Sequence, residues 1–397
     1  MRCLVTGGAG FIGSHTVDAL LTKGYQVRIL DNLSKPVHLK GKPAYLSAEA
    51  EFLLGDVRNK EDWEKALTDI DMIFHFAAYQ DYLPDFSTFF HVNSVGTALL
   101  YEVIVEKRLN IQKVIVASSQ AVYGEGKYRC PRCNRIKYPN IRPLEKLKNG
   151  EWDIACEENH HLLQAMWTNE NRVNPQNQYA ISKYTQELTS MTLGERYRIP
   201  TCCLRYSIVQ GPRQSVYNAY SGACRIFCLS QFFDEQPSIY EDGQQMRDFV
   251  NIHDVVSANL TVLESPKADY QVFNVGGGKA YTVLDFAQIV SVVFGKDIKP
   301  KITSEYRFGD TRHIFSDISR LRSLGWNPQY SPKDSVAEYV NWLEGLTDLD
   351  NILEEAKLKM KQLDVIRRSN GNNSRSKIID RKSYRGRRGR VGVRSEK

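Results

Sequence analysis

Three residues in the first half of the chain have types and spacing suited to proton transfer at a hydroxyl group: Ser119, Tyr179 and Lys183. Tyr179 and Lys183 are four positions apart, so on a helix they lie on one face. A nearby ammonium stabilises a phenolate, so we expect the pKa of Tyr179 to fall from about 10 toward neutrality. Tyr179 would then act as a general base, while Ser119 hydrogen-bonds the same hydroxyl as it becomes a carbonyl.

An isolated tyrosine–lysine pair is unspecific, so its meaning depends on the elements around it. The chain begins with a short apolar strand, Cys3-Leu4-Val5, followed by glycines at positions 7, 10 and 13. An amphipathic segment follows, and a second strand then ends at Asp31. This order is typical of a dinucleotide-binding unit, in which the glycines permit a tight turn, close approach of a pyrophosphate and helix packing. A carboxylate at Asp31 accepts from ribose hydroxyls and repels a 2′-phosphate, which favours NAD over NADP.

Three further apolar runs, at 52–54, 72–76 and 113–117, predict strands of the same sheet. The loop after the first contains Asp56, a candidate for the adenine amino group, although a solvated turn is the simpler alternative. Small residues after the second allow the cofactor to approach the backbone. The predicted cofactor contacts are Gly7, Gly10, Phe11, Ile12, Gly13, Asp31, Asn32, Asp56, Val57, Ala77, Ala78, Asn93, Tyr179 and Lys183.

Five segments in this order resemble the extended short-chain dehydrogenase/reductase family, and within it the NAD-dependent nucleotide-sugar epimerase/dehydratase branch. They are Thr6–Gly13, Phe74–Ala78, Asn93–Thr97, Ser118–Gly124 and Tyr179–Lys183. The resemblance extends from residue 1 to about 345. It implies an α/β fold: a Rossmann doubly wound parallel sheet over residues 1–205, and a smaller interleaved C-terminal substrate domain mainly over 206–345. It also implies a homodimer.

The residues after Ser119 help to choose the reaction. Dehydratases of the branch carry an Asp-Glu pair at this place, whereas this chain has Gln120-Ala121. Without an added acid or base, the chemistry is limited to reversible oxidation and reduction. The resemblance therefore implies an isomerase, a nucleotide-sugar 4-epimerase of the dTDP-L-rhamnose or UDP-glucose 4-epimerase type. The alternatives are a reductase or dehydratase of the same branch, or a non-catalytic NAD-sensing or nucleic-acid-binding protein.

The expected substrate contacts come from both halves of the chain. The resemblance assigns the diphosphate to Arg247 and Arg307, for which a guanidinium fork is well suited. A surface ion pair is the alternative for each. Ile208 stands where many relatives have an asparagine, which leaves the sugar open. The predicted substrate contacts are Ser119, Gln120, Asn218, Arg247 and Arg307.

The 60 positions between Ser119 and Tyr179 are about twice the usual spacing in the branch, so residues 125–170 form an insertion. It contains Cys130, Cys133, Cys156 and His160, a pattern that fits a four-ligand structural zinc site. A loop with two solvent-facing thiols is the alternative. A similar cysteine-bearing insertion occurs in epimerases that resemble dTDP-L-rhamnose 4-epimerase. We expect the insertion to lie over the substrate mouth.

The chain ends differently from the family pattern. Residues 346–366 predict a short helix that docks on the body or on a partner subunit, and residues 367–397 predict a disordered basic tail. The tail accounts for the positive net charge of +7, because it holds 12 Lys/Arg against 2 Asp/Glu while the rest of the chain is slightly acidic. Its Arg385–Arg390 segment is a candidate for weak binding to RNA or anionic surfaces, or else a solubilising tail.

The bulk properties fit an ordinary globular protein, with 42% hydrophobic and 25% charged residues. The N-terminal apolar run is interrupted by the glycine turn, so we predict no signal peptide, and we also predict no membrane span. Eight cysteines without a secretory signal predict a reducing compartment, the cytoplasm.

Overall fold

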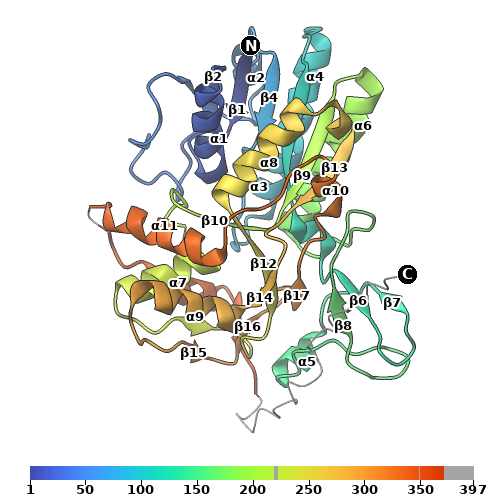
Figure 1. The fold of residues 1–397 in the computed structure, drawn as a ribbon, viewed down its shortest axis with the longest axis vertical. Helices are drawn as coiled ribbons and strands as arrows, with labels where there is room; N and C mark the ends of the chain where they lie inside the picture. The colour runs from blue at the N-terminus through green and yellow to red at the C-terminus, as the bar shows by residue number, and fades with distance from the viewer. Residues whose placement is uncertain (219–221, 348, 371–397) are drawn as a thin grey trace, which may run out of the picture.

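The computed structural model describes residues 1–218, 222–347 and 349–370. Its centre is a parallel seven-stranded sheet in the order β13-β9-β5-β4-β1-β2-β3 (Figure 1). The strands are β1 (Arg2–Thr6), β2 (Gln26–Asp31), β3 (Glu51–Leu54), β4 (Met72–His75), β5 (Lys113–Ser119), β9 (Thr201–Tyr206) and β13 (Gln271–Val275). Most of these strands are buried along their length, because helices cover both faces. The predicted Rossmann-type fold is confirmed.

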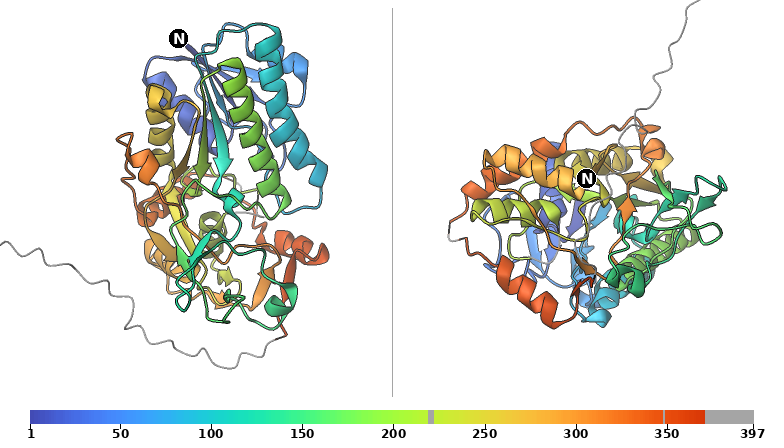
Figure 2. Two further views of the ribbon diagram at one scale, coloured as in Figure 1. Left: turned by 90° about the vertical axis from the view of Figure 1, so that its right-hand side faces the viewer. Right: turned by 90° about the horizontal axis from the view of Figure 1, so that it is seen from below.

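Two helical layers cover the sheet. On one face lie α1 (Phe11–Thr22), α8 (Ile252–Glu264) and α10 (Ser319–Arg322), and on the other lie α2 (Lys60–Ala66), α4 (Gly96–Glu106) and α6 (Gln178–Tyr197). Figure 2 shows α4 and α6 side by side on the outer surface. The chain runs from β1 to β2 and β3, then crosses to β4 on the other side of β1. This reversal opens a crevice at the carboxyl ends of β1 and β4.

One stretch of the described residues, Phe86–Glu106, is long and apolar enough to cross a membrane. It comprises α3 (Phe86–Phe90), the π-helical turn His91–Val95 and α4. In the fold it packs against α2 and α6, which explains its apolar composition.

A second, smaller domain lies below the carboxyl edge of the sheet (Figure 1). Its helices α7 (Ala223–Phe232), α9 (Val283–Phe294) and α11 (Pro332–Glu344) enclose a core that includes Phe227, Phe286 and Tyr339. Its sheet joins β10 (Ile208–Gln210), β12 (Met246–Asn251), β14 (Ala280–Thr282) and β17 (His313–Ile314), and β11 (Ser238–Ile239) pairs with β15 (Lys301–Ile302). The chain returns from this domain to the large sheet through β13.

The insertion forms a three-stranded sheet of its own beside the smaller domain (Figure 1). It contains β6 (Lys127–Arg129), β7 (Ile136–Lys137), α5 (Leu144–Lys148) and β8 (Gln164–Met166). Two arginine–carboxylate pairs attach it to the body. Arg142 Nη2 donates to Glu241 Oε1 at 2.7 Å, with both groups buried, and the buried Arg312 donates through Nε to Oδ1 of the exposed Asp153 at 2.8 Å.

The last elements in the described part of the chain are α12 (Leu353–Gln362) and β18 (Ile366–Arg368), which pairs with β16 (Glu305–Arg307). Ala356 and Met360 of α12 are buried. The predicted tail therefore begins too early, because Arg367 and Arg368 belong to a paired strand. Residues 371–397 of the predicted tail, including Arg385–Arg390, lie outside the described residues.

Candidate active site

A cavity of about 910 Å³ lies between the two domains, in the crevice at the carboxyl edge of the large sheet. It brings together nearly all of the site residues that the sequence predicts. Those that line it are Gly7, Gly10, Phe11, Ile12, Gly13, Asp31, Asn32, Asp56, Val57, Ala77, Ala78, Ser119, Gln120, Tyr179, Lys183, Asn218, Arg247 and Arg307.

The glycine turn fits a dinucleotide because side chains are excluded from it. Gly7 has φ of 66°, and a Cβ there would lie 2.8 Å from the nitrogen of Ala77. A Cβ on Gly13 would lie 2.1 Å from the carbonyl oxygen of Gly7. Gly10 is the N-cap of α1, which has no side-chain cap and no acidic residue in its first turn. The exposed helix dipole at this end of the cavity suits a phosphate.

Two carboxylates, Asp31 at the end of β2 and Asp56 after β3, line the cavity. Asp31 accepts hydrogen bonds from the backbone nitrogens of Ala9 at 3.0 Å and Leu33 at 2.9 Å, so it also holds the turn together. Burial tends to raise the pKa of Asp56, but hydrogen bonds from Arg58 and Asn32 outweigh it and lower the pKa to about 2. Both are placed beside the cavity, as the sequence predicts.

Asn93 is placed differently from the prediction, because it is buried behind the cavity wall and is not among the residues that line it. Its Oδ1 accepts from the nitrogen of Tyr79 at 2.8 Å, and its Nδ2 donates to Ser182 Oγ at 2.9 Å. It therefore fixes the loop after β4 against α6. The Asn93–Thr97 motif therefore contains a residue that positions the cavity wall and does not itself line the cavity.

Ser119 and Tyr179 both line the cavity and are joined by a hydrogen bond. Ser119 ends β5 and opens the 3-10 turn Gln120–Tyr123, while Tyr179 lies in the first turn of α6, which Asn177 caps. A hydrogen bond with Ser119 favours the phenolate of Tyr179, but burial dominates and raises the pKa to about 12. The prediction that Lys183 lowers this pKa is wrong for the protein alone.

The Lys183 ammonium is engaged elsewhere: its Nζ donates to Oε1 of Gln186, one turn further along α6. Gln186 Nε2 in turn donates to Thr97 Oγ1 at 2.9 Å. Burial lowers the pKa of Lys183 to about 7, an effect that the charges of Cys203 and Glu187 oppose. The lysine is therefore close to its titration point at neutral pH.

The hydrogen bonds of Thr97 determine the tautomer of His75. The Thr97 hydroxyl donates to the carbonyl oxygen of Asn93 at 2.7 Å, so His75 Nε2, at 2.9 Å, must donate to it. His75 Nδ1 is then the acceptor for Thr6 Oγ1 at 2.8 Å. Burial, followed by the charge of Lys183, lowers the pKa of His75 to about 3, so the ring is neutral. This buried chain connects Lys183 to β1.

A second buried network supports the serine. Arg205 on β9 pairs with Glu187 on α6, and Glu187 Oε2 accepts from Ser118 Oγ at 2.9 Å. Arg205 Nη1 also donates to the Tyr123 hydroxyl at 2.8 Å. These bonds fix the end of β5 relative to α6, and therefore Ser119 relative to Tyr179.

The predicted arginines lie at the substrate-domain end of the cavity. Arg307 Nε donates to Asp310 Oδ2 at 2.8 Å, and its guanidinium lies 4.2 Å from the Tyr82 ring centroid. Arg247 donates to backbone oxygens, including that of Thr311 at 2.6 Å. Both guanidinium groups are held in fixed orientations at the cavity wall.

A third arginine at this end was missed from the sequence. Arg225 on α7 lines the cavity and is 2% exposed, yet among the described residues its Nε and Nη2 have no hydrogen-bond partner. Burial lowers its pKa to about 10. Asn218 Oδ1 and Gln120 Oε1 are likewise buried without a partner. The sequence feature that could have identified Arg225 is its position as the one charged residue inside the apolar run 223–229.

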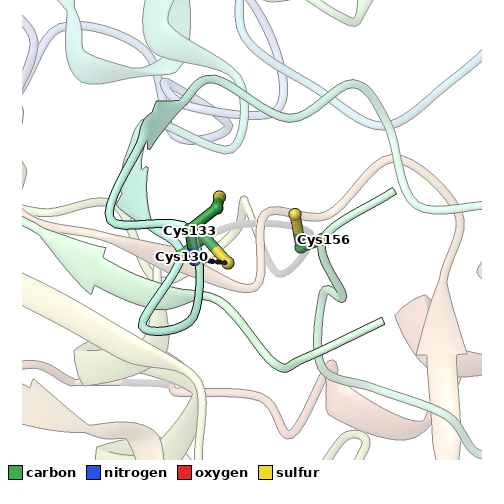
Figure 3. Close-up of side chains that lie close together, drawn as sticks. All are labelled: Cys130, Cys133 and Cys156. Carbon is green, nitrogen blue, oxygen red and sulfur yellow. Dashed lines mark hydrogen bonds between the residues drawn. The ribbon is translucent and has the colours of Figure 1, made fainter. Parts of the chain in front are cut away.

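The insertion differs from prediction in two respects. Residues 125–170 are all described, and none is among the residues that line the cavity, so the insertion does not cover the mouth. Its three cysteines do converge, with all three Sγ atoms within 4.8 Å of one another (Figure 3). Among the described residues this group does not include His160, which was the predicted fourth ligand.

The fold and cavity define a Rossmann-type, dinucleotide-binding protein with a serine, tyrosine and lysine at its centre. The chain belongs to the NAD dependent epimerase/dehydratase family, whose model matches residues 3–146 and 157–276. The family resemblance seen in the sequence is therefore confirmed.

Similar proteins agree with this assignment. The chain is 31% identical to a dTDP-L-rhamnose 4-epimerase of Burkholderia thailandensis, over 88% of this chain and 97% of the relative. It is 32% identical to a putative UDP-glucose 4-epimerase of Methanocaldococcus jannaschii, over 86% and 98%. A solved structure of UDP-glucose 4-epimerase with UDP-glucose from Thermotoga maritima is similar with a TM-score of 0.72 and 29% identity, covering 87% of this chain and 99% of that one.

Proposed function

We propose that this protein is an NAD-dependent 4-epimerase of nucleoside-diphosphate hexoses. The observation that carries the proposal is one cavity that joins the glycine turn, the Ser119–Tyr179 pair and three arginines. Relatives named dTDP-L-rhamnose and UDP-glucose 4-epimerase support it. The structure of UDP-glucuronic acid 4-epimerase from Bacillus cereus with UDP-glucuronic acid and NAD, 26% identical with a TM-score of 0.70, adds to this support.

The residues at the carboxyl ends of β1 and β2 fit NAD. Gly7, Gly10 and Gly13 leave room for its pyrophosphate beside α1, and Asp31 is positioned for the adenosine ribose. NAD, when bound, supplies first the acceptor and then the donor of the C4 hydride. Lys183 and Tyr179 line the same cavity and are proposed to face the end of NAD that exchanges hydride.

Tyr179 removes the proton of the C4 hydroxyl as that carbon becomes a ketone, and returns it after inversion. Because burial raises the pKa of Tyr179, the phenolate needs a donor and a positive charge. Ser119 provides the donor, and Lys183, one turn further along α6, is proposed to provide the charge in the complex, although it does not lower this pKa in the protein alone. The 4-keto sugar turns over in the cavity and receives hydride on its other face. Gln120 and Ala121 offer no carboxylate for loss of water, which disfavours the dehydratase alternative.

Arg225, Arg247 and Arg307 are proposed to bind the diphosphate of the substrate. Nε and Nη2 of Arg225 lack partners among the described residues, so an oxyanion would satisfy them. Arg225→Met is expected to raise KM by roughly 10- to 100-fold, because hydrogen bonds between charged groups contribute about 1.5–3 kcal/mol. Arg172→Met is the matched control, since Arg172 is an exposed arginine that follows the insertion and does not line the cavity.

We propose further that two copies associate through α4 and α6. Beside these helices Val95, Ile181 and Leu188 are 46%, 42% and 50% exposed, and Ile181 and Leu188 lie seven positions apart on α6. Leu188→Glu is expected to convert a dimer into a monomer by light scattering. We also propose a cytoplasmic location, since all eight cysteines lie in the described part of the chain and are free thiols.

The test of the activity is to incubate the purified protein with a panel of UDP- and dTDP-hexoses without added NAD, and to follow C4 configuration by NMR. Inversion at C4 is expected, and the panel identifies the sugar. Turnover only of a 4-keto sugar with added NADH would assign a reductase and contradict the proposal. Inactivity with the hexose panel, whether or not NAD is added, and with a 4-keto sugar and NADH would favour the binding-protein alternative.

A further inference from the structure

Two turns in the insertion have the same backbone hydrogen bonds. In the first, Cys130 N donates to Arg135 O at 3.0 Å and Asn134 N donates to Cys130 O at 2.9 Å. In the second, Cys156 N donates to His161 O at 2.8 Å and His160 N donates to Cys156 O at 2.8 Å. The residue four positions after the cysteine has a left-handed backbone conformation in both turns, with φ of 57° at Asn134 and 58° at His160.

This equivalence aligns Cys130 with Cys156, and Cys133 with Asn159. In the first turn Cys133 N donates to Cys130 Sγ at 3.5 Å (Figure 3). Asn159 Nδ2 reaches the same sulfur, at 3.4 Å. Position 159 therefore lies beside the thiol of Cys130, whereas His160 has the left-handed backbone conformation of its turn. The pattern is C-x-x-C followed by C-x-x-N.

The sulfur geometry is close to that of a zinc centre. The three Sγ atoms lie within 4.8 Å of one another, and the thiols are free. Zinc–sulfur bonds of about 2.3 Å in a tetrahedron place sulfurs roughly 3.8 Å apart. A small inward movement of the two turns would close this set around one ion.

The insertion has little apolar core to hold its two turns together. The whole of 125–170 is described, and its buried apolar side chains are Tyr128, Cys130, Leu147 and Cys156. Half of these are the cysteines themselves, and Ile136, Leu162 and Trp167 are exposed. A unit this small with so little core generally needs a disulfide or a metal.

We propose that Cys130, Cys133 and Cys156 bind a structural zinc ion, with Asn159 at the fourth position. Arg135 and Lys137 both pair with Glu158 between the turns, and they place positive charge beside the three thiolates. The inference does not rest on the proposed function, because its readout is metal content.

The test measures zinc per chain in the full-length protein by elemental analysis after expression with zinc. One zinc per chain is expected. Cys133→Ser and Cys156→Ser should lose it, while Cys224→Ser, which removes a buried thiol of α7, should retain it. Zinc well below one per chain, or zinc retained by Cys133→Ser, would overturn the proposal.

A gain-of-affinity variant keeps the test valid if the serine variants misfold. Asn159→Cys completes two C-x-x-C turns, and it should lower the zinc Kd by roughly tenfold or more because a thiolate replaces a weak amide ligand. Cobalt added to the chelator-treated wild type should give the absorption of tetrahedral thiolate coordination. An unchanged Kd in Asn159→Cys would show that position 159 does not face the metal.

Discussion

At the scale of single residues, the chemistry depends on Tyr179, and its surroundings oppose its ionisation. Burial raises its pKa to about 12, and the hydrogen bond with Ser119 offsets only part of that effect. The proposed role requires the phenol oxygen itself, because it is the atom that takes and returns the proton.

Tyr179→Phe removes this oxygen while keeping the ring. We expect kcat to fall by roughly 100- to 10,000-fold with little change in thermal stability, as is typical for loss of a general base. Tyr184→Phe, on the same helix, is the matched control and should remain active. A Tyr179→Phe enzyme with near wild-type kcat would assign the proton transfer to another group.

Lys183 is a buried cation whose charge the fold tolerates poorly. Its pKa falls from 10.5 in the unfolded chain to about 7. Between these values the unfolded chain holds a proton that the folded protein does not, so this lysine makes the folded state more stable as pH rises from about 7 toward 10.

Lys183→Met should therefore stabilise the protein stripped of dinucleotide, by roughly 1–3 kcal/mol at pH 6. The gain should shrink toward pH 9, where the wild-type lysine is neutral in the folded state. Urea unfolding at both pH values measures the difference, and Lys107→Met at an exposed site is the control. A gain that is absent at pH 6, or that grows with pH, would contradict the assigned pKa direction.

At the scale of elements, the insertion is fixed to the substrate domain through buried charges. Arg142 donates to Glu241 and also, through Nη2, to the carbonyl oxygen of Asp310 at 2.7 Å. Asp310 in turn orients Arg307 in the cavity wall. The insertion thus supports Arg307, which is proposed to bind the diphosphate, although the insertion does not line the cavity.

Arg142→Met removes the positive charge that pairs with the buried carboxylates of Glu125 and Glu241. It also removes the hydrogen bond to the carbonyl oxygen of Asp310. We expect a loss of about 3 kcal/mol in the free energy of unfolding, since breaking a buried ion pair strands a charge. KM for the nucleotide sugar should rise while kcat changes little. Lys146→Met, which breaks an exposed pair with Glu151 in the same insertion, should change neither. An unchanged KM in Arg142→Met would show that the insertion does not influence substrate binding through Asp310 and Arg307.

At the scale of the whole molecule, local sequence patterns predicted the large sheet and the cavity lining. Glycine spacing and apolar runs are short-range signals, so Gly7, Asp31 and Ser119 were placed from sequence. The missed features depend on contacts between distant segments. The direction of the Tyr179 pKa depends on burial, the role of Asn93 on packing against α6, and the importance of Arg225 on a cavity shared by two domains. For the metal site, sequence spacing suggested His160, whereas the backbone geometry points to position 159.

The central claim is that C4 inverts by loss and return of the same hydrogen as hydride within one cavity. The most direct measurement uses a nucleotide hexose deuterated at C4, incubated in ordinary water without added cofactor, with the product examined by NMR. The account predicts an inverted product that retains deuterium at C4. Inversion with loss of deuterium to water would contradict it, because the C4 hydrogen would then leave as a proton.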